Sequence, residues 1–236
     1  MCAFFLCFSL ASQAQDFTVT GQIDLVSEGS APSKKSNRAN VVVWLTSLDD
    51  PTGLHAVSEE TPPHPPRLVQ KNKRFTPHVL VVPAGTAVEF PNHDPFFHNV
   101  FSLFEGKRFD LGLYEAGTTR MVRFDRAGVS YIFCNIHPEM SAVVVALKTP
   151  YYGLSDASGK IAIAHVPPGR YSVQVWAEGA SAANLKAVSR ELVLSGGEHS
   201  LGVVRIVEDS PPAPHKNKYG REYDAPGTDY PPTEPK

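Results

Sequence analysis

The sequence has little cysteine. Its 236 residues contain three, and two of them, Cys2 and Cys7, lie in the apolar run 1–14 (MCAFFLCFSLASQA). This run lacks the usual positively charged start, but it ends in the small residues Ser12 and Ala14, as a signal-peptidase site requires. We therefore expect residues 1–14 to be a signal peptide removed near Gln15, and the protein to be periplasmic or secreted.

Cleavage of this run would leave Cys134 as the lone cysteine, which excludes an internal disulfide. A single thiol in a chain of this size is often a buried, inert side chain. In an exported protein, however, an unprotected thiol is open to oxidation and cross-linking. A metal bound to the sulfur is therefore the second interpretation, and both stay open at this point.

The sequence also lacks a strong charge of either sign and a long apolar run. Its formal net charge is -2, with 42% hydrophobic and 19% charged residues. Without a basic excess, nucleic acid is not an expected partner. The N-terminal run is too short to span a bilayer, and no later stretch is long and apolar enough. We therefore expect no membrane span.

Sustained helical spacing of apolar residues is missing as well. Short apolar runs, alternating or continuous, are separated instead by turn-forming sequences such as PAG, PNHD and PPG. Many short strands at close spacing predict an all-β sandwich or barrel. The predicted strands are 17–25, 41–46, 79–82, 86–90, 129–134, 142–147, 161–164, 171–176, 191–194 and 202–207.

Two segments are rich in proline. Residues 60–67 (ETPPHPPR) cannot form a central strand, and we interpret them as a linker. Residues 208–236 contain almost no aliphatic side chains and many prolines and charges, which predicts a disordered tail.

The residues with distinctive chemistry gather between positions 98 and 140. Cys134 ends a strand-like run, and His137 and Met140 follow it before the next strand opens at Ser141. His98 comes from a separate loop. Two imidazoles, one thiolate and a distant thioether form the trigonal site with a weak axial sulfur that suits copper cycling between +1 and +2. A loop held at both ends by strands, and stiffened by a proline, would keep such a site rigid.

These residues resemble a known family. The stretch 73–148 looks like a cupredoxin, and its short Cys-x-x-His-x-x-Met loop is most similar to that of amicyanins. The runs KRFTPHVLVVPAGTAVEFPNHDPFFHNV and AGVSYIFCNIHPEM carry the resemblance. It implies a Greek-key β-sandwich over residues 67–148 and one type 1 copper, Cu(I)/Cu(II), with the ligands His98, Cys134, His137 and Met140.

The same resemblance implies that Asn99 helps to fix the loop that bears the cysteine. It also implies that His137 lies near the surface, where Phe96, Phe97 and Pro138 would form a docking patch for an unidentified redox protein. Ordinary core packing is the alternative for the two phenylalanines. The sequence departs from the family at the positions that alternate with Cys134, which are Ile132 and Ser130 where many cupredoxins place aromatics; Tyr131 and Phe133 fall on the opposite face.

The remaining histidines show no spacing typical of metal ligands. His93 lies in a turn-forming sequence, which predicts a solvated side chain. We expect the others to be structural or exposed: His55, His64, His78, His165, His199 and His215.

The flanking segments 16–66 and 149–207, joined end to end, resemble a carboxypeptidase-regulatory-like (transthyretin-like) β-sandwich. The matching residues are Asp156, Gly159, Pro167, Pro168, Gly169 and Tyr171. The resemblance implies a second small β-sandwich, interrupted by the cupredoxin domain and without catalytic residues. In a rival partition, the strand at 41–46 belongs to the copper domain.

Four functions fit the sequence unequally. Electron transfer without catalysis is preferred, because the metal positions are filled by protein and the His-x-His pairs of copper oxidases are missing. A copper chaperone or storage protein is the alternative, although such proteins favour open sites rich in Met and His. A cysteine hydrolase using Cys134 with His98 or His137 leaves Met140 without a role and has no evident orienting acid. The fourth is a structural module with a buried cysteine.

Overall fold

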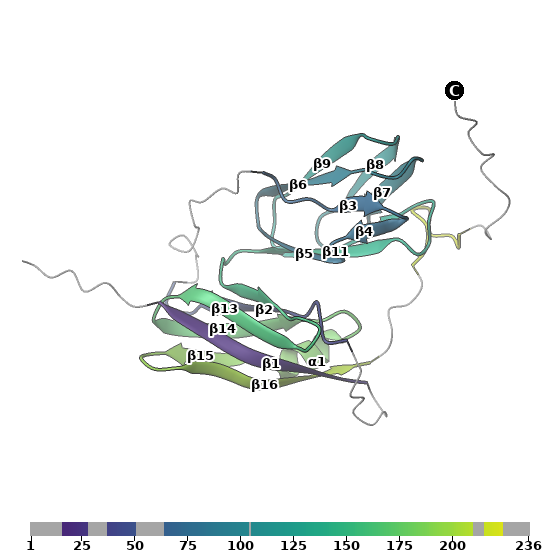
Figure 1. Cartoon of the computed structure of the whole chain (residues 1–236). Helices are drawn as coiled ribbons and strands as arrows, with labels where there is room; N and C mark the ends of the chain where they lie inside the picture. Colours follow the sequence, from purple (N-terminus) through teal and green to yellow (C-terminus); the bar gives the residue numbers. More distant parts are fainter. Residues whose placement is uncertain (1–15, 28–36, 51–63, 104, 210–214, 224–236) are drawn as a thin grey trace, which may run out of the picture. The chain divides into compact units, whose positions relative to one another are not determined.

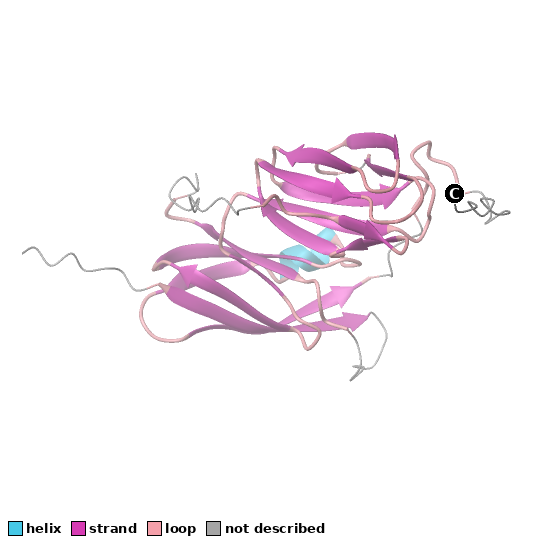
Figure 2. Cartoon of the chain, turned by 45° about the horizontal axis from the view of Figure 1, so that its top comes forward, coloured by secondary structure: helices cyan, strands magenta, loops and turns pink. Residues whose placement is uncertain are grey.

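The computed structural model describes residues 16–27, 37–50, 64–103, 105–209 and 215–223, in which the regular structure is almost entirely β-strand (Figure 1). The prediction of an all-β chain is confirmed, and each predicted strand overlaps an observed one. Figure 2 shows the single short helix among the strands of this described part. The predicted signal peptide at 1–14 and positions 60–63 of the proline-rich segment lie outside the described residues.

Contacts divide the chain into two compact units. The first combines Met1–His55 with Tyr151–Asp209, and the second combines Ala56–Pro150 with Ser210–Lys236. In the described residues, the structure has no helix with the length and apolar character that crossing a membrane requires.

The first unit contains two sheets, of strand order β13-β1-β16 and β12-β2-β14-β15. β1 pairs with β13 in the antiparallel sense and with β16 in the parallel sense, and β14 lies antiparallel between β2 and β15. The elements are β1 (Phe17–Ser27), β2 (Val42–Ser47), β12 (Tyr152–Leu154), β13 (Lys160–Val166), β14 (Gly169–Trp176), α1 (Ala182–Ala187), β15 (Arg190–Leu194) and β16 (His199–Glu208).

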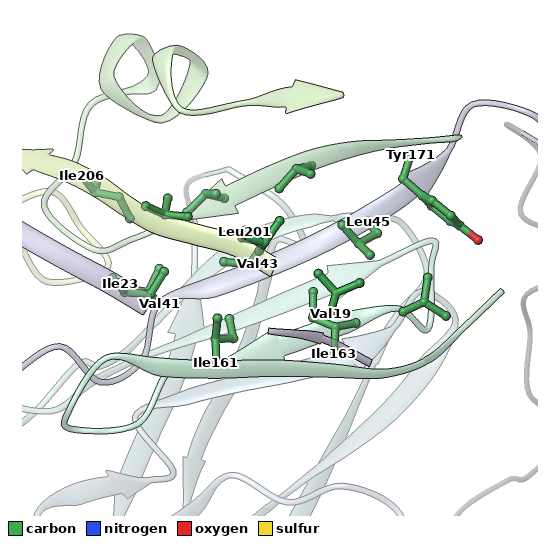
Figure 3. Close-up of a cluster of buried hydrophobic side chains, with 14 of the residues drawn as sticks. Val19, Ile23, Val41, Val43, Leu45, Ile161, Ile163, Tyr171, Leu201 and Ile206 are labelled. Atoms are coloured by element: carbon green, nitrogen blue, oxygen red, sulfur yellow. The ribbon is translucent and has the colours of Figure 1, made fainter. Parts of the chain in front are cut away.

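The two sheets of this unit enclose a core of branched aliphatic side chains (Figure 3). Val19 and Ile163, which face each other across β1 and β13, are both buried, as are Val43 and Leu45 of β2. Period-two alternation places every second side chain on the inner face of a sheet, so the alternating sequence of β13 produces its alternating burial. The strand at 41–46 pairs with β12 and β14 and so belongs to this unit.

The second unit contains a sheet of order β5-β11-β10-β7-β8 and the pairs β6-β9 and β3-β4. β5 runs parallel to β11, whereas β11, β10, β7 and β8 are successively antiparallel. The strands are β3 (Val69–Lys71), β4 (Arg74–Thr76), β5 (Val79–Pro83), β6 (Thr86–Pro91), β7 (His98–Ser102), β8 (Phe109–Tyr114), β9 (Thr119–Phe124), β10 (Gly128–Cys134) and β11 (Ser141–Leu147).

The core of the second unit reaches the lone cysteine. Cys134 and Met140 are fully buried in the same hydrophobic cluster as Phe90 and Ile132. Ser130, which alternates with Ile132 along β10, is also buried, whereas Phe133 lies outside this cluster and packs against Phe101. An isoleucine and a serine therefore stand on the cysteine's side of β10, and an aromatic stands on the other.

The C-terminal segment differs in part from the sequence expectation. Residues 210–214 and 224–236 of the predicted disordered tail lie outside the described residues, but residues 215–223 make specific contacts with the second unit. Residues 215–223 contain no aliphatic side chain, as the composition of the tail indicates. Composition cannot reveal, however, that Tyr223 and Lys218 donate hydrogen bonds to Cys134 and Asn135.

Candidate metal centre

The loop that joins β10 to β11 is closed by its own backbone. The N–H of Cys134 donates to the carbonyl of Met140 at 3.2 Å, and the N–H of Met140 donates to the carbonyl of His137 at 3.1 Å. Phe133 and Ser141 face each other at the base, where the two strands pair. Because the hairpin fixes both ends of the loop, the three side chains predicted to bind metal are held on one short turn.

His98 reaches the same place from a different strand. It is the first residue of β7, and β7 pairs with β10 so that Val100 lies opposite Cys134. The turn before it is held by Asn92, whose side chain accepts from the N–H of Asp94 at 3.0 Å and donates to the carbonyl of Phe96 at 2.8 Å. This arrangement is an Asx-turn, which explains why the PNHD sequence stands there.

The structure brings three predicted ligand side chains together. The Sγ of Cys134 lies 3.6 Å from Nδ1 of His98 and 3.6 Å from Nδ1 of His137. The three ligand atoms all lie within 4.8 Å of one another, and no other such group of His, Cys, Asp and Glu occurs in the described residues. Met140, the fourth predicted ligand, is fully buried at the end of the same loop.

These separations fit a shared metal ion. Bonds of about 2.3 Å to sulfur and about 2.0 Å to nitrogen, at tetrahedral to trigonal angles, place the sulfur and each nitrogen about 3.5 to 3.7 Å apart. The donor set of one thiolate and two imidazoles, with a buried thioether nearby, is the set that copper takes in trigonal sites. The residues present therefore fit copper.

Burial controls the protonation of the donor groups. Removal from water raises the pKa of the Cys134 thiol, although the backbone N–H groups of Asn99, Ile136 and His137 pull it down. Burial also lowers the pKa of His98 and of His137, which favours the neutral imidazole that a metal requires. The site thus combines a thiol that is poorly ionised with two imidazoles that are uncharged.

Asp94 is a functional residue that the sequence analysis missed. Its Oδ2 lies 2.9 Å from Nε2 of His98, and its carboxylate also accepts from the backbone N–H groups of Asn72 and Lys73 at 2.6 and 3.0 Å. Burial alone would raise the pKa of the Asp94 carboxyl, but these bonds hold it below its usual value. The only signal in the sequence was an aspartate four residues before a candidate ligand, in the quoted PNHD turn.

The Asp94 carboxylate selects one tautomer of His98. An ionised carboxylate only accepts hydrogen bonds, so Nε2 of a neutral His98 must carry the proton. Nδ1 therefore keeps its lone pair, and Nδ1 is the nitrogen that faces Cys134. Orientation of a metal-binding histidine by a carboxylate on its other nitrogen is common in metal sites.

Asn99 contacts the cysteine loop through its backbone. Its carbonyl accepts from the N–H of Asn135 at 2.8 Å, while its side-chain amide donates to Asp110 at 2.7 Å. In the structure, the main chain of Asn99 contacts the cysteine loop, whereas its side chain contacts Asp110 on β8.

The residues of the predicted docking patch differ in exposure. Phe97 is 46% exposed, and Pro138 is exposed beside His137. Phe96 is half-buried, with its ring centroid 5.3 Å from that of His98 and 5.5 Å from that of His137. His93 is exposed, as predicted for a turn histidine.

A search of solved structures finds cupredoxins. A purple cupredoxin from Nitrosopumilus maritimus is 23% identical, with a TM-score of 0.32 over 35% of this chain and 99% of that one. A reduced variant of amicyanin is 20% identical, with a TM-score of 0.34 over 37% of this chain and 87% of that one. A copper-containing nitrite reductase from Thermus scotoductus is 25% identical, with a TM-score of 0.35 over 42% of this chain and 26% of that one. No protein-family model and no curated protein matches the chain.

Proposed function

We propose that this chain is a type 1 copper protein that carries single electrons. The observation that carries the proposal is the convergence of two imidazole Nδ1 atoms, each 3.6 Å from the Cys134 Sγ, on one buried thiol. Copper supplies one-electron cycling between Cu(I) and Cu(II) when it is bound. His98, Cys134 and His137 would hold it as the trigonal set, and Met140 would be the weak axial ligand.

The surrounding hydrogen bonds support this role because they leave the donor groups little freedom to move. Asp94 orients His98, and the carbonyl of Asn99 holds the peptide that follows Cys134. A site whose ligands keep their places in both oxidation states loses little energy to rearrangement when the electron moves.

Access to the site points to an electron carrier rather than to an enzyme. Cys134, His98 and Met140 are fully buried, and His137 is 9% exposed. A substrate molecule would have no open position at the metal, whereas an electron can pass through the edge of His137. We propose that the exposed residues Phe97 and Pro138 receive an unidentified redox protein, together with the half-buried Phe96, whose ring lies against His98 and His137.

Domain organisation and location complete the proposal. Residues Ala56–Pro150 of the second unit stand in the chain between the two parts of the first, which supports a cupredoxin inserted into a transthyretin-like sandwich. The apolar N-terminal run ending in small residues supports export to the periplasm or the medium.

The cysteine-hydrolase alternative gains one element from the structure, because Asp94 supplies the orienting acid that the sequence did not reveal. Cys134, His98 and Asp94 then stand in the order of a nucleophile, a base and an acid. However, a reactive cysteine has a lowered pKa and is partly exposed, whereas Cys134 is fully buried and its pKa is raised. The second imidazole on the same sulfur also has no role in hydrolysis.

The optical spectrum tests the proposal. Purified protein mixed with one equivalent of Cu(II) is expected to become intensely blue or green through thiolate-to-copper charge transfer, and Cys134→Ser is expected to abolish the colour. Met121→Leu is the control, since this side chain is 57% exposed on β9 and lies outside the buried cluster that contains Cys134 and Met140. A wild-type protein that stays colourless with stoichiometric copper contradicts the type 1 assignment. Rapid loss of copper to a competing chelator would instead indicate a chaperone.

A further inference from the structure

The C-terminal segment 215–223 lies against the peptide that follows Cys134. The hydroxyl of Tyr223 donates to the carbonyl of Cys134 at 2.7 Å, and the N–H of Lys218 donates to the side-chain oxygen of Asn135 at 2.9 Å. The ring of His215 stacks on Phe133, with centroids 4.0 Å apart. Three consecutive residues, Phe133, Cys134 and Asn135, are therefore contacted by residues far away in the sequence, two of them through their side chains and Cys134 through its carbonyl.

The hydrogen-bond directions around Tyr223 are determined by its partners. Nδ1 of His215 faces the carbonyl of Lys216 at 3.4 Å and the hydroxyl oxygen of Tyr223 at 3.1 Å. The Cys134 carbonyl can only accept, so the hydroxyl proton of Tyr223 points to it, and Nδ1 of His215 donates to the Tyr223 oxygen. An unbroken chain of donors therefore runs from His215 to the carbonyl of the cysteine.

The peptide between Cys134 and Asn135 is consequently held on both sides. Its N–H donates to the carbonyl of Asn99 on β7, and its C=O accepts from Tyr223. These two bonds fix the plane of the peptide and, with it, the backbone position from which the Cys134 side chain projects. Only the bond to Asn99 comes from the sheet that contains Cys134, and the bond from Tyr223 comes from the C-terminal segment.

Lys218 connects the segment 215–223 to the cysteine loop a second time, through Asp110 and Asn99. Its Nζ lies 2.9 Å from Oδ2 of Asp110, and Oδ1 of Asp110 accepts from the side chain of Asn99 at 2.7 Å. The segment thus contacts the cysteine loop directly and also, through Asp110, the residue whose carbonyl holds that loop. Lys218 is only 19% exposed in its side chain, so this ion pair is partly shielded from water.

We infer that residues 215–223 form a strap that positions Cys134 for the metal, with Tyr223 and Lys218 as positioning residues. The effect of the strap on a metal rests on the proposed copper function, whereas the contacts of the strap with Cys134 and Asn135 do not depend on it. Removing the Tyr223 hydroxyl would release one side of the Cys134–Asn135 peptide while leaving every donor side chain in place.

Tyr223→Phe in the full chain tests this inference, with Tyr219→Phe as the matched control. Tyr219 lies in the same segment but is 71% exposed. Its N–H donates to Asn217 and its ring lies beside Nζ of Lys218, and phenylalanine keeps both the backbone bond and the ring. In metal-free protein, hydrogen exchange at the N–H of Asn135 is expected to be about threefold to tenfold faster in Tyr223→Phe. The control is expected to match the wild type.

With copper bound, the reduction potential gives a second reading that a purely structural role would not move. Loss of the hydrogen bond to the cysteine carbonyl leaves more electron density on that residue, so the potential is expected to fall. A threefold change in the relative affinities for the two oxidation states corresponds to about 28 mV, at about 59 mV per tenfold. Lys218→Met is expected to shift both readings in the same direction.

Equal results for Tyr223→Phe and Tyr219→Phe would overturn the inference. Faster exchange with an unchanged potential would overturn it too, because the strap would then stabilise the loop without acting on the metal site. If the wild type takes up no copper, the proposed function has failed, and exchange at Asn135 alone decides whether the strap holds the Cys134 peptide.

Discussion

The Asp94 carboxylate and the Nε2 of His98 lie 2.9 Å apart, and both side chains are almost fully buried. The same carboxylate accepts two backbone N–H groups from the turn between β3 and β4. One side chain therefore joins the hairpin turn to the histidine that faces the thiol. The tautomer of His98 and the position of the hairpin depend on the same negative charge.

Asp94→Asn is expected to weaken Cu(II) binding by about 10-fold to 100-fold, as is typical when the partner of a metal-binding histidine is changed. A neutral amide oxygen accepts less strongly, and the amide N–H₂ group opposes donors that the carboxylate satisfied. Competition with a chelator of known affinity measures the loss. In metal-free protein, ¹⁵N NMR is expected to show His98 as a mixture of tautomers instead of the Nε2–H form.

Asp125→Asn is the control for this change, because its carboxylate is exposed and pairs with Lys107 instead of a histidine. It is expected to bind copper as the wild type does. Wild-type affinity in Asp94→Asn would show that the carboxylate holds the hairpin turn and does nothing for the metal.

The spacing of the candidate ligands could be predicted from the sequence because three of the four lie on one loop. Cys134, His137 and Met140 lie on a single turn between two strongly apolar strands, so local pattern and local structure agree. The long strands were predictable for the same reason, since alternation along β1 or β13 records which side chains face the core.

The missed features are either too short to show a pattern or depend on contacts between segments that are distant in the chain. β3 and β4 have three residues each, too few for alternation to be recognised, and β9 buries only Val122 and Phe124. α1 has six residues and buries none, so it shows no apolar face. Asp94 and Tyr223 act through hydrogen bonds to distant residues, and no periodicity records such bonds.

Met140→Leu is expected to keep the colour of the copper form and to raise its reduction potential. Leucine has a similar volume, so the fully buried site is refilled at a cost below about 1.5 kcal/mol in stability. The thioether lone pair is lost, which removes a donor that stabilises the more highly charged ion, and the axial ligand is known to tune such potentials. Cyclic voltammetry measures the shift. Met121→Leu, at a position 57% exposed, should leave the potential unchanged; a shift of equal size there would contradict an axial role for Met140.

Lys73→Gly is expected to stabilise the fold by up to about 1 kcal/mol, because a residue other than glycine is strained in the left-handed region. Asn72 and Lys73 form the two-residue turn between β3 and β4, and both have φ of 55°. A hairpin turn with two positive φ values favours Asn followed by Gly. The backbone N–H of residue 73 remains available to Asp94 after the change. Urea unfolding measures the gain, and Asn72→Gly should gain less because asparagine tolerates this conformation. A loss of stability in Lys73→Gly would mean that contact of its side chain with the Phe96 ring outweighs the strain.

Phe97→Ser is expected to slow electron self-exchange between the Cu(I) and Cu(II) forms by about fivefold to tenfold, since apolar anchors at the centre of a contact carry much of its energy. Phe97 is 46% exposed, directly precedes His98 and belongs to the docking patch proposed above. The substitution removes apolar surface without touching a donor group, and the optical spectrum should therefore stay the same. NMR line widths in mixtures of the two oxidation states give the rate. Val203→Ser on β16 of the first unit, at a site 61% exposed, is the matched control and should exchange electrons at the wild-type rate. If both variants slow equally, electrons do not leave by the face that bears Phe97, and the proposed docking patch is wrong even where the copper site is right.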